Sequence, residues 1–187
     1  MIVAIADQCG VHGTLIAAHL AALREHGGHS VLALDAAGAR RVASRFKELI
    51  PDYHDIVIDT EGGDTPEGRA ALAAANLVIV PVEAGQADLE KQYKLIARLN
   101  AARIFNPGLH VLFVTVGGSI DLTAEQRKAI RSYVAHVMSA TLAATVIHDD
   151  PVFSIGHRTA ICHAGATGAP EQRAAELRAL YREVFVN

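Results

Sequence analysis

The sequence predicts an α/β fold: a doubly wound, mainly parallel sheet flanked by helices. Short apolar segments rich in Val and Ile alternate along the chain with longer amphipathic segments. The apolar segments are nearly continuous runs, which is typical of parallel strands that are buried on both faces. A length of 187 residues with 51% hydrophobic content suits one domain with a large core. We therefore expect a single domain over residues 1–187, with right-handed β-α-β connections.

The individual elements follow from local composition. Each expected strand is short, rich in β-branched residues and bounded by turn formers: 2–6, 30–35, 55–59, 77–82, 110–116 and 142–147. The expected helices have helical spacing of apolar residues: 14–26, 65–75, 87–105, 123–137 and 170–184, with a further short helix after Asp35. In such sheets ligands bind beyond the carboxyl ends of the strands. The candidate site therefore lies at the edge that carries the loop 8–14, Asp35 and Asp59.

The segment Ala-Asp-Gln-Cys-Gly-Val-His-Gly-Thr at 6–14 joins the first expected strand to the first expected helix. A strand, glycine-rich turn and helix present backbone N–H groups and the positive end of a helix dipole to one point, which is an anion site. Nucleotide hydrolysis also needs a lysine on the phosphates and a Ser or Thr hydroxyl on Mg²⁺. The segment has no lysine and keeps only Thr14. The candidate nucleotide-binding residues are Gln8, Cys9, Gly10, Val11, His12, Gly13, Thr14 and Asp35.

The stretch ADQCGVHGTLIAAHLAAL, followed by VLALD, resembles the opening of the ParA/MinD group of deviant Walker ATPases, whose loop reads KGGxGK[ST]. In this resemblance Gln8 replaces the signature lysine that reaches across a dimer, and Gly13 replaces the ordinary P-loop lysine. Two further positions carry side chains where the family has glycine: Cys9 and His12. The remaining loop positions match: Gly10, Val11 and Thr14. Later blocks, including HDIVIDTEGGD and HVLFVTV, also resemble this P-loop NTPase family, so the resemblance covers nearly the whole chain.

The resemblance assigns roles to carboxylates at strand ends. Asp35 matches the first acid of the family's Asp-x-Asp-Pro-Gln, whereas Ala37 replaces the second, which helps to position the attacking water. Asp59 resembles the Mg²⁺-proximal carboxylate, so Thr14 and Asp59 are the candidate Mg²⁺ ligands. An Asp at this place also caps a following glycine turn in many proteins, and that interpretation stays open. Losing one preorganised electrostatic contact costs about a hundredfold in rate, so we expect ATP hydrolysis to be absent or very slow.

Two functions fit the expected fold. The first is a degenerate ParA-like protein of plasmid or chromosome partition, or of protein positioning, which binds a partner and has weak or absent nucleotide binding and little or no ATP hydrolysis. The alternative is an active ParA-like ATPase whose ATP-dependent dimerisation drives DNA partition. A ligase of the dethiobiotin-synthetase or cobyrinate-amidase kind shares the architecture but needs the same missing lysine. The residues at Gln8, Gly13 and Ala37 favour the first function, and enzymatic activity stays open.

The resemblance implies the cofactors and the protein partners, and composition bears on nucleic-acid and membrane binding. The expected cofactor is ATP or ADP with Mg²⁺, or none. The expected partners are a protein of partition, transfer or positioning machinery and, in a homodimer, a second copy. A formal net charge of −3 gives little support to nucleic-acid binding, although one compact basic cluster is present: Arg40, Arg41, Arg45 and Lys47. No apolar run reaches the roughly 20 residues of a membrane span and no signal peptide is seen, so a cytoplasmic protein is expected.

Overall fold

A computed structural model describes residues 1–7, 11–42, 45–60, 63–83, 89–117, 122–148 and 169–186. These residues form one six-stranded sheet with strand order β2-β3-β1-β4-β5-β6, in which all neighbouring strands are parallel. The strands are β1 (Ile2–Ile5), β2 (Val31–Leu34), β3 (Asp55–Asp59), β4 (Leu77–Glu83), β5 (His110–Val116) and β6 (Ala140–Ile147). The predicted doubly wound α/β fold is confirmed. Strand β1 lies between β3 and β4, so β2 and β3 are on one side of β1 and the later strands are on the other. Doubly wound sheets bind ligands where the strand order reverses in this way, beyond the carboxyl ends of the strands.

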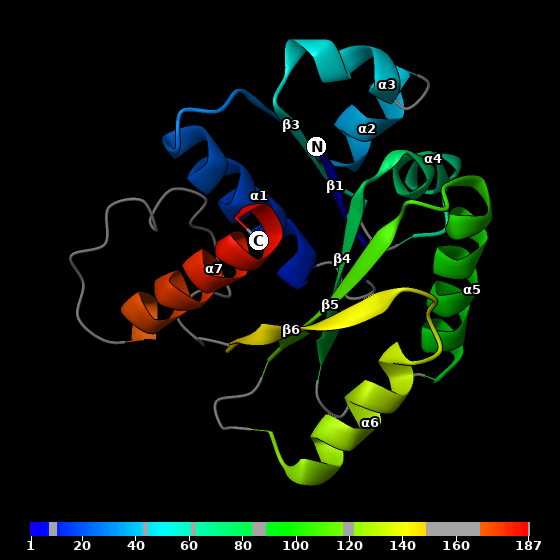
Figure 1. The fold of residues 1–187 in the computed structure, drawn as a ribbon, viewed down its shortest axis with the longest axis vertical. Coiled ribbons are helices and arrows are strands. Elements are labelled where there is room, and N and C mark those ends of the chain that lie inside the picture. The colour runs from blue at the N-terminus through cyan, green and yellow to red at the C-terminus, as the bar shows by residue number, and fades with distance from the viewer. Residues whose placement is uncertain are drawn as a thin grey trace.

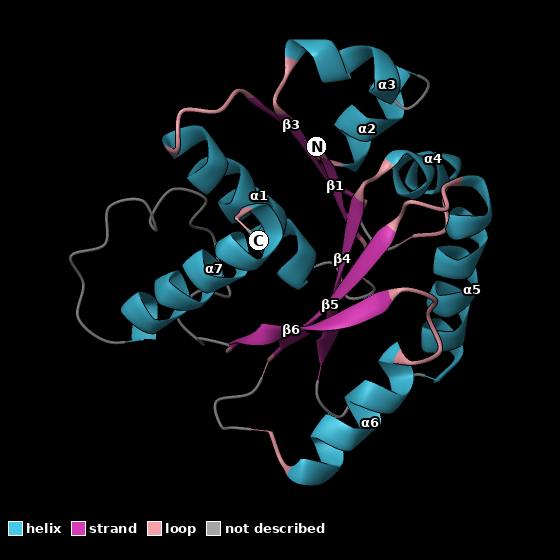
Figure 2. Cartoon of the chain, viewed as in Figure 1, coloured by secondary structure: helices cyan, strands magenta, loops and turns pink. Residues whose placement is uncertain are grey.

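Helices cover both faces of this sheet (Figure 1). Helices α1 (Val11–His26) and α7 (Ala169–Phe185) lie on one face, and α4 (Pro66–Ala74), α5 (Leu89–Phe105) and α6 (Ala124–Val134) lie on the other. The short elements α2 (Ala36–Val42), α3 (Phe46–Leu49) and η2 (Ile50–Asp52) connect β2 to β3. Figure 2 shows the strands enclosed between these two helical layers. Among the described residues, no helix has the length and apolar character needed to cross a bilayer.

The core consists of two apolar clusters, one under each helical layer. Both clusters contain residues of the strands, because successive side chains of a buried strand point to opposite faces of the sheet. The cluster under α1 and α7 contains buried leucine and isoleucine side chains, among them Ile5, Ile16, Leu20, Leu177 and Leu180. The cluster under α4, α5 and α6 includes Ile58, Leu72, Leu99, Phe113 and Ile130. Burial on both faces explains why the strands are continuous apolar runs in the sequence.

Two predicted helix boundaries were wrong. The first helix begins at Val11 rather than at Thr14, so Gly13 lies inside its first turn instead of in a loop. The predicted helix over 123–137 ends at Val134. Its start is set by Thr123, whose hydroxyl accepts the Gln126 N–H at 3.2 Å while its own N–H donates to the Gln126 side chain at 2.9 Å. This capping box places Thr123 just outside the helix.

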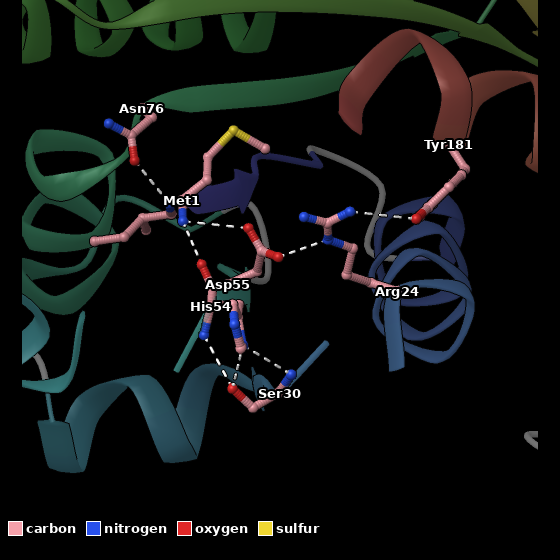
Figure 3. A network of polar contacts seen from close by, with 8 residues as sticks. Met1, Arg24, Ser30, His54, Asp55, Asn76 and Tyr181 are labelled. Atoms are coloured by element: carbon pink, nitrogen blue, oxygen red, sulfur yellow. Dashed lines mark hydrogen bonds and ion pairs between the residues drawn. The ribbon is translucent and has the colours of Figure 1, made fainter. Parts of the chain in front are cut away.

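The amino ends of β1 and β3 are joined by a polar network around Asp55 (Figure 3). The buried Asp55 carboxylate accepts a hydrogen bond from Arg24 Nε at 2.6 Å and lies 3.2 Å from the Met1 amino group. That amino group also donates to the His54 carbonyl at 2.6 Å, and Arg24 reaches the Tyr181 hydroxyl of α7 at 3.5 Å. Burial opposes ionisation of Asp55, but the hydrogen bonds from Arg24 and Met1 outweigh it and lower its pKa below the ordinary value.

Candidate functional site

The connection from β1 to α1 contains a buried carboxylate that the sequence analysis did not select. Asp7, which is 2% exposed, accepts the backbone N–H of Gly13 through Oδ2 at a distance of 2.6 Å. Gly13 lies in the first turn of α1, where unpaired N–H groups and the helix dipole favour a negative charge. A carboxylate of the chain itself therefore uses an N–H group of the segment that was predicted to bind phosphate. The available signal was an Asp placed between a strand and a glycine-containing turn.

Gly13 is enclosed so tightly that position 13 has no space for a side chain. A Cβ added there would lie 2.5 Å from the Asp7 Cβ and 3.2 Å from the Ile5 Cγ2. The first of these distances is far below van der Waals contact, and the Asp7 Cβ is held close to the backbone. A lysine at position 13, as in the resembling family, therefore requires a different residue or a different conformation at position 7.

The two candidate Mg²⁺ ligands do lie together. Thr14 Oγ1 donates to Asp59 Oδ2 at 2.5 Å, although the two residues are separated by an entire β-α-β unit in the sequence. Asp59 is the last residue of β3 and is buried, and the next residue, Thr60, fixes this strand end by donating its N–H and its hydroxyl to the Ile5 carbonyl at 3.1 and 2.8 Å. A hydroxyl beside a carboxylate is the oxygen pair with which P-loop proteins hold Mg²⁺.

The imidazole of His12 faces a second carboxylate that the sequence analysis did not select. His12 is buried, and its Nε2 atom lies 3.4 Å from Oε1 of Glu83, the last residue of β4. The contact is an ion pair when His12 is protonated. Three strands thus bring acidic side chains to this edge of the sheet: Asp7 after β1, Asp59 from β3 and Glu83 from β4. Their combined field is negative.

The remaining predicted residues have other placements. Asp35 caps helix α2, because its Oδ1 atom accepts the Gly38 N–H at 2.7 Å. Val11 is the first residue of α1. The candidates Gln8, Cys9 and Gly10 lie outside the described residues.

The basic cluster is a solvent-exposed surface where its side chains are described, at Arg40, Arg41 and Arg45. Arg40 Nε lies 3.7 Å from a Glu67 carboxylate oxygen, and Arg45 Nε donates to Glu48 at 2.8 Å. Arg40 and Arg45 are therefore each paired with a carboxylate. Within the part of the chain that the structure describes, no three His, Cys, Asp or Glu side chains converge to hold a metal ion.

No protein-family model and no curated protein matches the sequence. Solved structures do match its fold. The cell division ATPase MinD of Pyrococcus furiosus superposes with a TM-score of 0.69 at 17% identity, covering 98% of this chain and 98% of that one. Cobyrinic acid a,c-diamide synthase of Mycobacterium smegmatis with bound ADP and magnesium gives 0.65 at 16% identity, covering 98% and 93% of the two chains. A plasmid partition protein of Borrelia burgdorferi gives 0.60 at 14%, covering 99% and 97%.

Proposed function

We propose that the protein is a degenerate ParA-like protein that acts by binding a partner, with weak or absent nucleotide binding and little or no ATP hydrolysis. The premise is the P-loop fold of the ParA/MinD type, and identities of 14–17% to the solved structures show that fold alone. The observation that carries this proposal is the 2.6 Å hydrogen bond from the Gly13 N–H to the Asp7 carboxylate. In this state the chain's own anion competes with any phosphate for the start of α1.

The electrostatics of the sheet edge point the same way. A phosphate entering beside Gly13 meets the carboxylates of Asp7, Asp59 and Glu83, whereas the described loop side chains include only one titratable base, His12. Charges about 4 Å apart interact with about 4 kcal/mol at the effective dielectric constant of a protein surface. The two positions at which the ParA/MinD loop has lysine are Gln8 and Gly13 in this chain. The loop sequence therefore contains no lysine that could offset the repulsion.

These residues therefore fit the metal ion of Mg²⁺-ATP but not its triphosphate. Thr14 and Asp59 fit a hydrated Mg²⁺ ion, because they already place a hydroxyl and a carboxylate oxygen 2.5 Å apart. The turn around Gly13 does not fit a triphosphate while Asp7 occupies its N–H group. The Thr14 and Asp59 pair is the observation that favours the alternative function, an active ParA-like ATPase whose ATP-dependent dimerisation drives DNA partition.

The setting comes from the proteins that share the fold. One is named a cell division ATPase and another a plasmid partition protein. We accordingly propose that this chain works in the cytoplasm with a protein of partition, transfer or positioning machinery, and that a homodimer is a second possible assembly. Direct DNA binding has less support, since the chain carries a formal net charge of −3.

Calorimetric titration with Mg²⁺-ATP and Mg²⁺-ADP separates the two functions. We expect no saturable binding to the wild type at millimolar nucleotide, and none to Gly13→Lys, whose side chain meets Asp7. Combining Asp7→Gly with Gly13→Lys removes both the competing carboxylate and the shortest contact, the 2.5 Å approach to Asp7 Cβ, so this double variant should bind. The matched control combines Asp35→Gly with Gly13→Lys; it makes the same change of charge at the cap of α2 and should not bind.

Two results would overturn the proposal. One is micromolar binding of Mg²⁺-ATP by the wild type. The other is ATP turnover that Asp59→Ala abolishes, because this would show that the Thr14 and Asp59 pair serves a working site. The double variant must first be shown to unfold with the same urea midpoint as the wild type or a higher one, so that a lack of binding reports on the site.

A further inference from the structure

Helices α4 and α5 leave a long groove between them on the outside of their layer. The groove has a volume of about 860 Å³, and its floor contains Leu72 and Leu95 together with the small side chains of Ala97 and Ala101. The α5 residues that line it recur at helical spacing from Lys91 to Phe105. At 1.5 Å per residue this is a length of about 20 Å, or four helical turns. Figure 1 shows the two helices side by side at the edge of the molecule, far from α1 and α7.

One end of the groove carries exposed apolar side chains. Phe105 lines the groove and is 81% exposed, and its neighbour Ile104 is 75% exposed. Both are at the end of α5. An aromatic side chain beside an apolar floor is the type of anchor that protein interfaces use, because it buries a large area at a low cost in conformational entropy.

The walls of the groove are positively charged on a chain whose formal net charge is −3. Among the described residues that line it, one carries a carboxylate, Asp64, and four carry a cationic side chain: Arg69, Lys91, Lys94 and Arg98. Asp64 accepts Arg69 Nε at 2.8 Å, and Lys94 donates to Glu90 at 2.6 Å. The described side chains of this surface thus include four bases and two acids, so a negatively charged partner is favoured.

Arg98 is much less exposed than the neighbouring cationic side chains of Arg69 and Lys94. Its side chain is only 12% exposed, and its Nε atom forms an ion pair with Asp64 Oδ1 at 3.6 Å. Burial lowers the pKa of its guanidinium below the ordinary value; Asp64 acts in the opposite direction and Arg69 in the same one. A carboxylate brought into the groove would meet a planar, partly desolvated donor group, which binds carboxylates well.

We infer that this groove is the docking site for an acidic amphipathic helix of the partner protein. The inference rests on the proposed function, since it assumes that the chain acts by binding a protein. A groove between two helices accepts a third helix, whose leucine-type face covers the apolar floor while flanking Glu or Asp residues reach Lys91, Lys94 and Arg98. A nucleic-acid backbone offers phosphates but no aliphatic face, so it would leave the apolar floor of the groove uncovered.

The test uses fluorescence anisotropy with two labelled 20-residue helical peptides. Both have leucine along one face; one has Glu at the flanking positions and the other has Lys. We expect the Glu peptide to bind at least about tenfold more tightly than the Lys peptide, with an affinity that falls as salt is added. Ala101→Glu, in the floor, and the pair Lys91→Glu with Lys94→Glu, on the wall, should each weaken the Glu peptide about tenfold or more.

The matched control is the pair Arg127→Glu with Lys128→Glu, which makes the same charge change on the exposed side of α6 and should leave binding within about twofold. The inference is overturned if neither peptide binds, if both bind equally, if the groove variants bind the Glu peptide normally, or if a 20-base-pair DNA binds better than the peptide. It is also overturned if light scattering shows a dimer that Ala101→Glu dissociates, since the occupant is then a second copy. None of these measurements contains nucleotide, so their failure leaves the calorimetric test of Asp7 and Gly13 unaffected.

Discussion

The two edges of the central sheet both hold buried carboxylates, but the groups that stabilise these carboxylates differ. At the amino edge, Asp55 lies between two full positive charges, the Arg24 guanidinium and the Met1 amino group (Figure 3). At the carboxyl edge, Asp7 is held by the Gly13 N–H and Asp59 by the Thr14 hydroxyl. Dipoles stabilise a carboxylate without cancelling its charge. At the amino edge the Asp55 charge is therefore fully compensated by cations, whereas at the carboxyl edge the Gly13 N–H and the Thr14 hydroxyl leave the negative charges of Asp7 and Asp59 in place.

The largest effect is expected at the amino edge. Asp55→Ala leaves Arg24 partly buried without its carboxylate, and breaking a buried pair in this way costs about 3 kcal/mol of the free energy of unfolding. Urea unfolding followed by circular dichroism measures this loss. Asp52→Ala, which removes an exposed carboxylate of the preceding turn, is the control and should leave the midpoint unchanged. A small loss in Asp55→Ala would mean that the two cations are solvated and that this edge is no stronger than the other.

The pH dependence of the same variant sharpens the comparison. The pKa of Asp55 is lower in the folded chain than its ordinary value, so the folded state binds fewer protons there than the unfolded state. Its stabilisation is complete above the unfolded pKa of about 4 and is lost as the pH falls through the lower folded value. The stability difference between wild type and Asp55→Ala should be constant from about pH 5 to 7 and should shrink below about pH 4. A difference that grows on acidification would contradict this assignment.

An intermediate effect is expected at Gly13. Its replacement by alanine places a Cβ 2.5 Å from the Asp7 Cβ, and overpacking of this kind costs about 2 kcal/mol. In an Asp7→Gly background the obstructing atom is absent, so Gly13→Ala should then cost little. A double-mutant cycle based on urea unfolding measures the coupling. Equal costs in the two backgrounds would show that the close contact between positions 7 and 13 is not what excludes a side chain.

The smallest effect is expected at Thr14. Thr14→Val removes the hydroxyl that donates to Asp59 but keeps the shape of the side chain, and a lost hydrogen bond of this type costs about 1 kcal/mol. Thr14→Ser keeps the hydroxyl and should restore most of that stability. If the valine and serine variants have the same unfolding midpoint, the contact between Thr14 and Asp59 contributes nothing to the stability of the fold. Its only effect would then be to hold the two candidate Mg²⁺ ligands together.

Local pattern was sufficient for most of the fold. The strand at 55–59 has the predicted ends, and so does the strand at 110–116, because both are apolar runs bounded by turn formers. The predicted start of α1 was wrong because Gly13 was interpreted as part of a turn. In the structure the Asp7 carboxylate accepts the Gly13 N–H, and the helix begins earlier, at Val11. Thr14 and Asp59 could be placed together because parallel strands bring their carboxyl ends to one edge.

The sequence by itself determined the parallel α/β sheet, the position of the β1 to α1 connection at its carboxyl edge and the absence of lysine from that connection. Only the tertiary structure decided that the Asp7 carboxylate meets the Gly13 N–H, that His12 faces Glu83, and that Asp55 joins Met1 and Arg24. Periodicity reports which face of an element is buried. Which atoms meet there depends on strand register, helix packing and side-chain rotamers, and these are set by contacts between distant segments once the whole core has assembled.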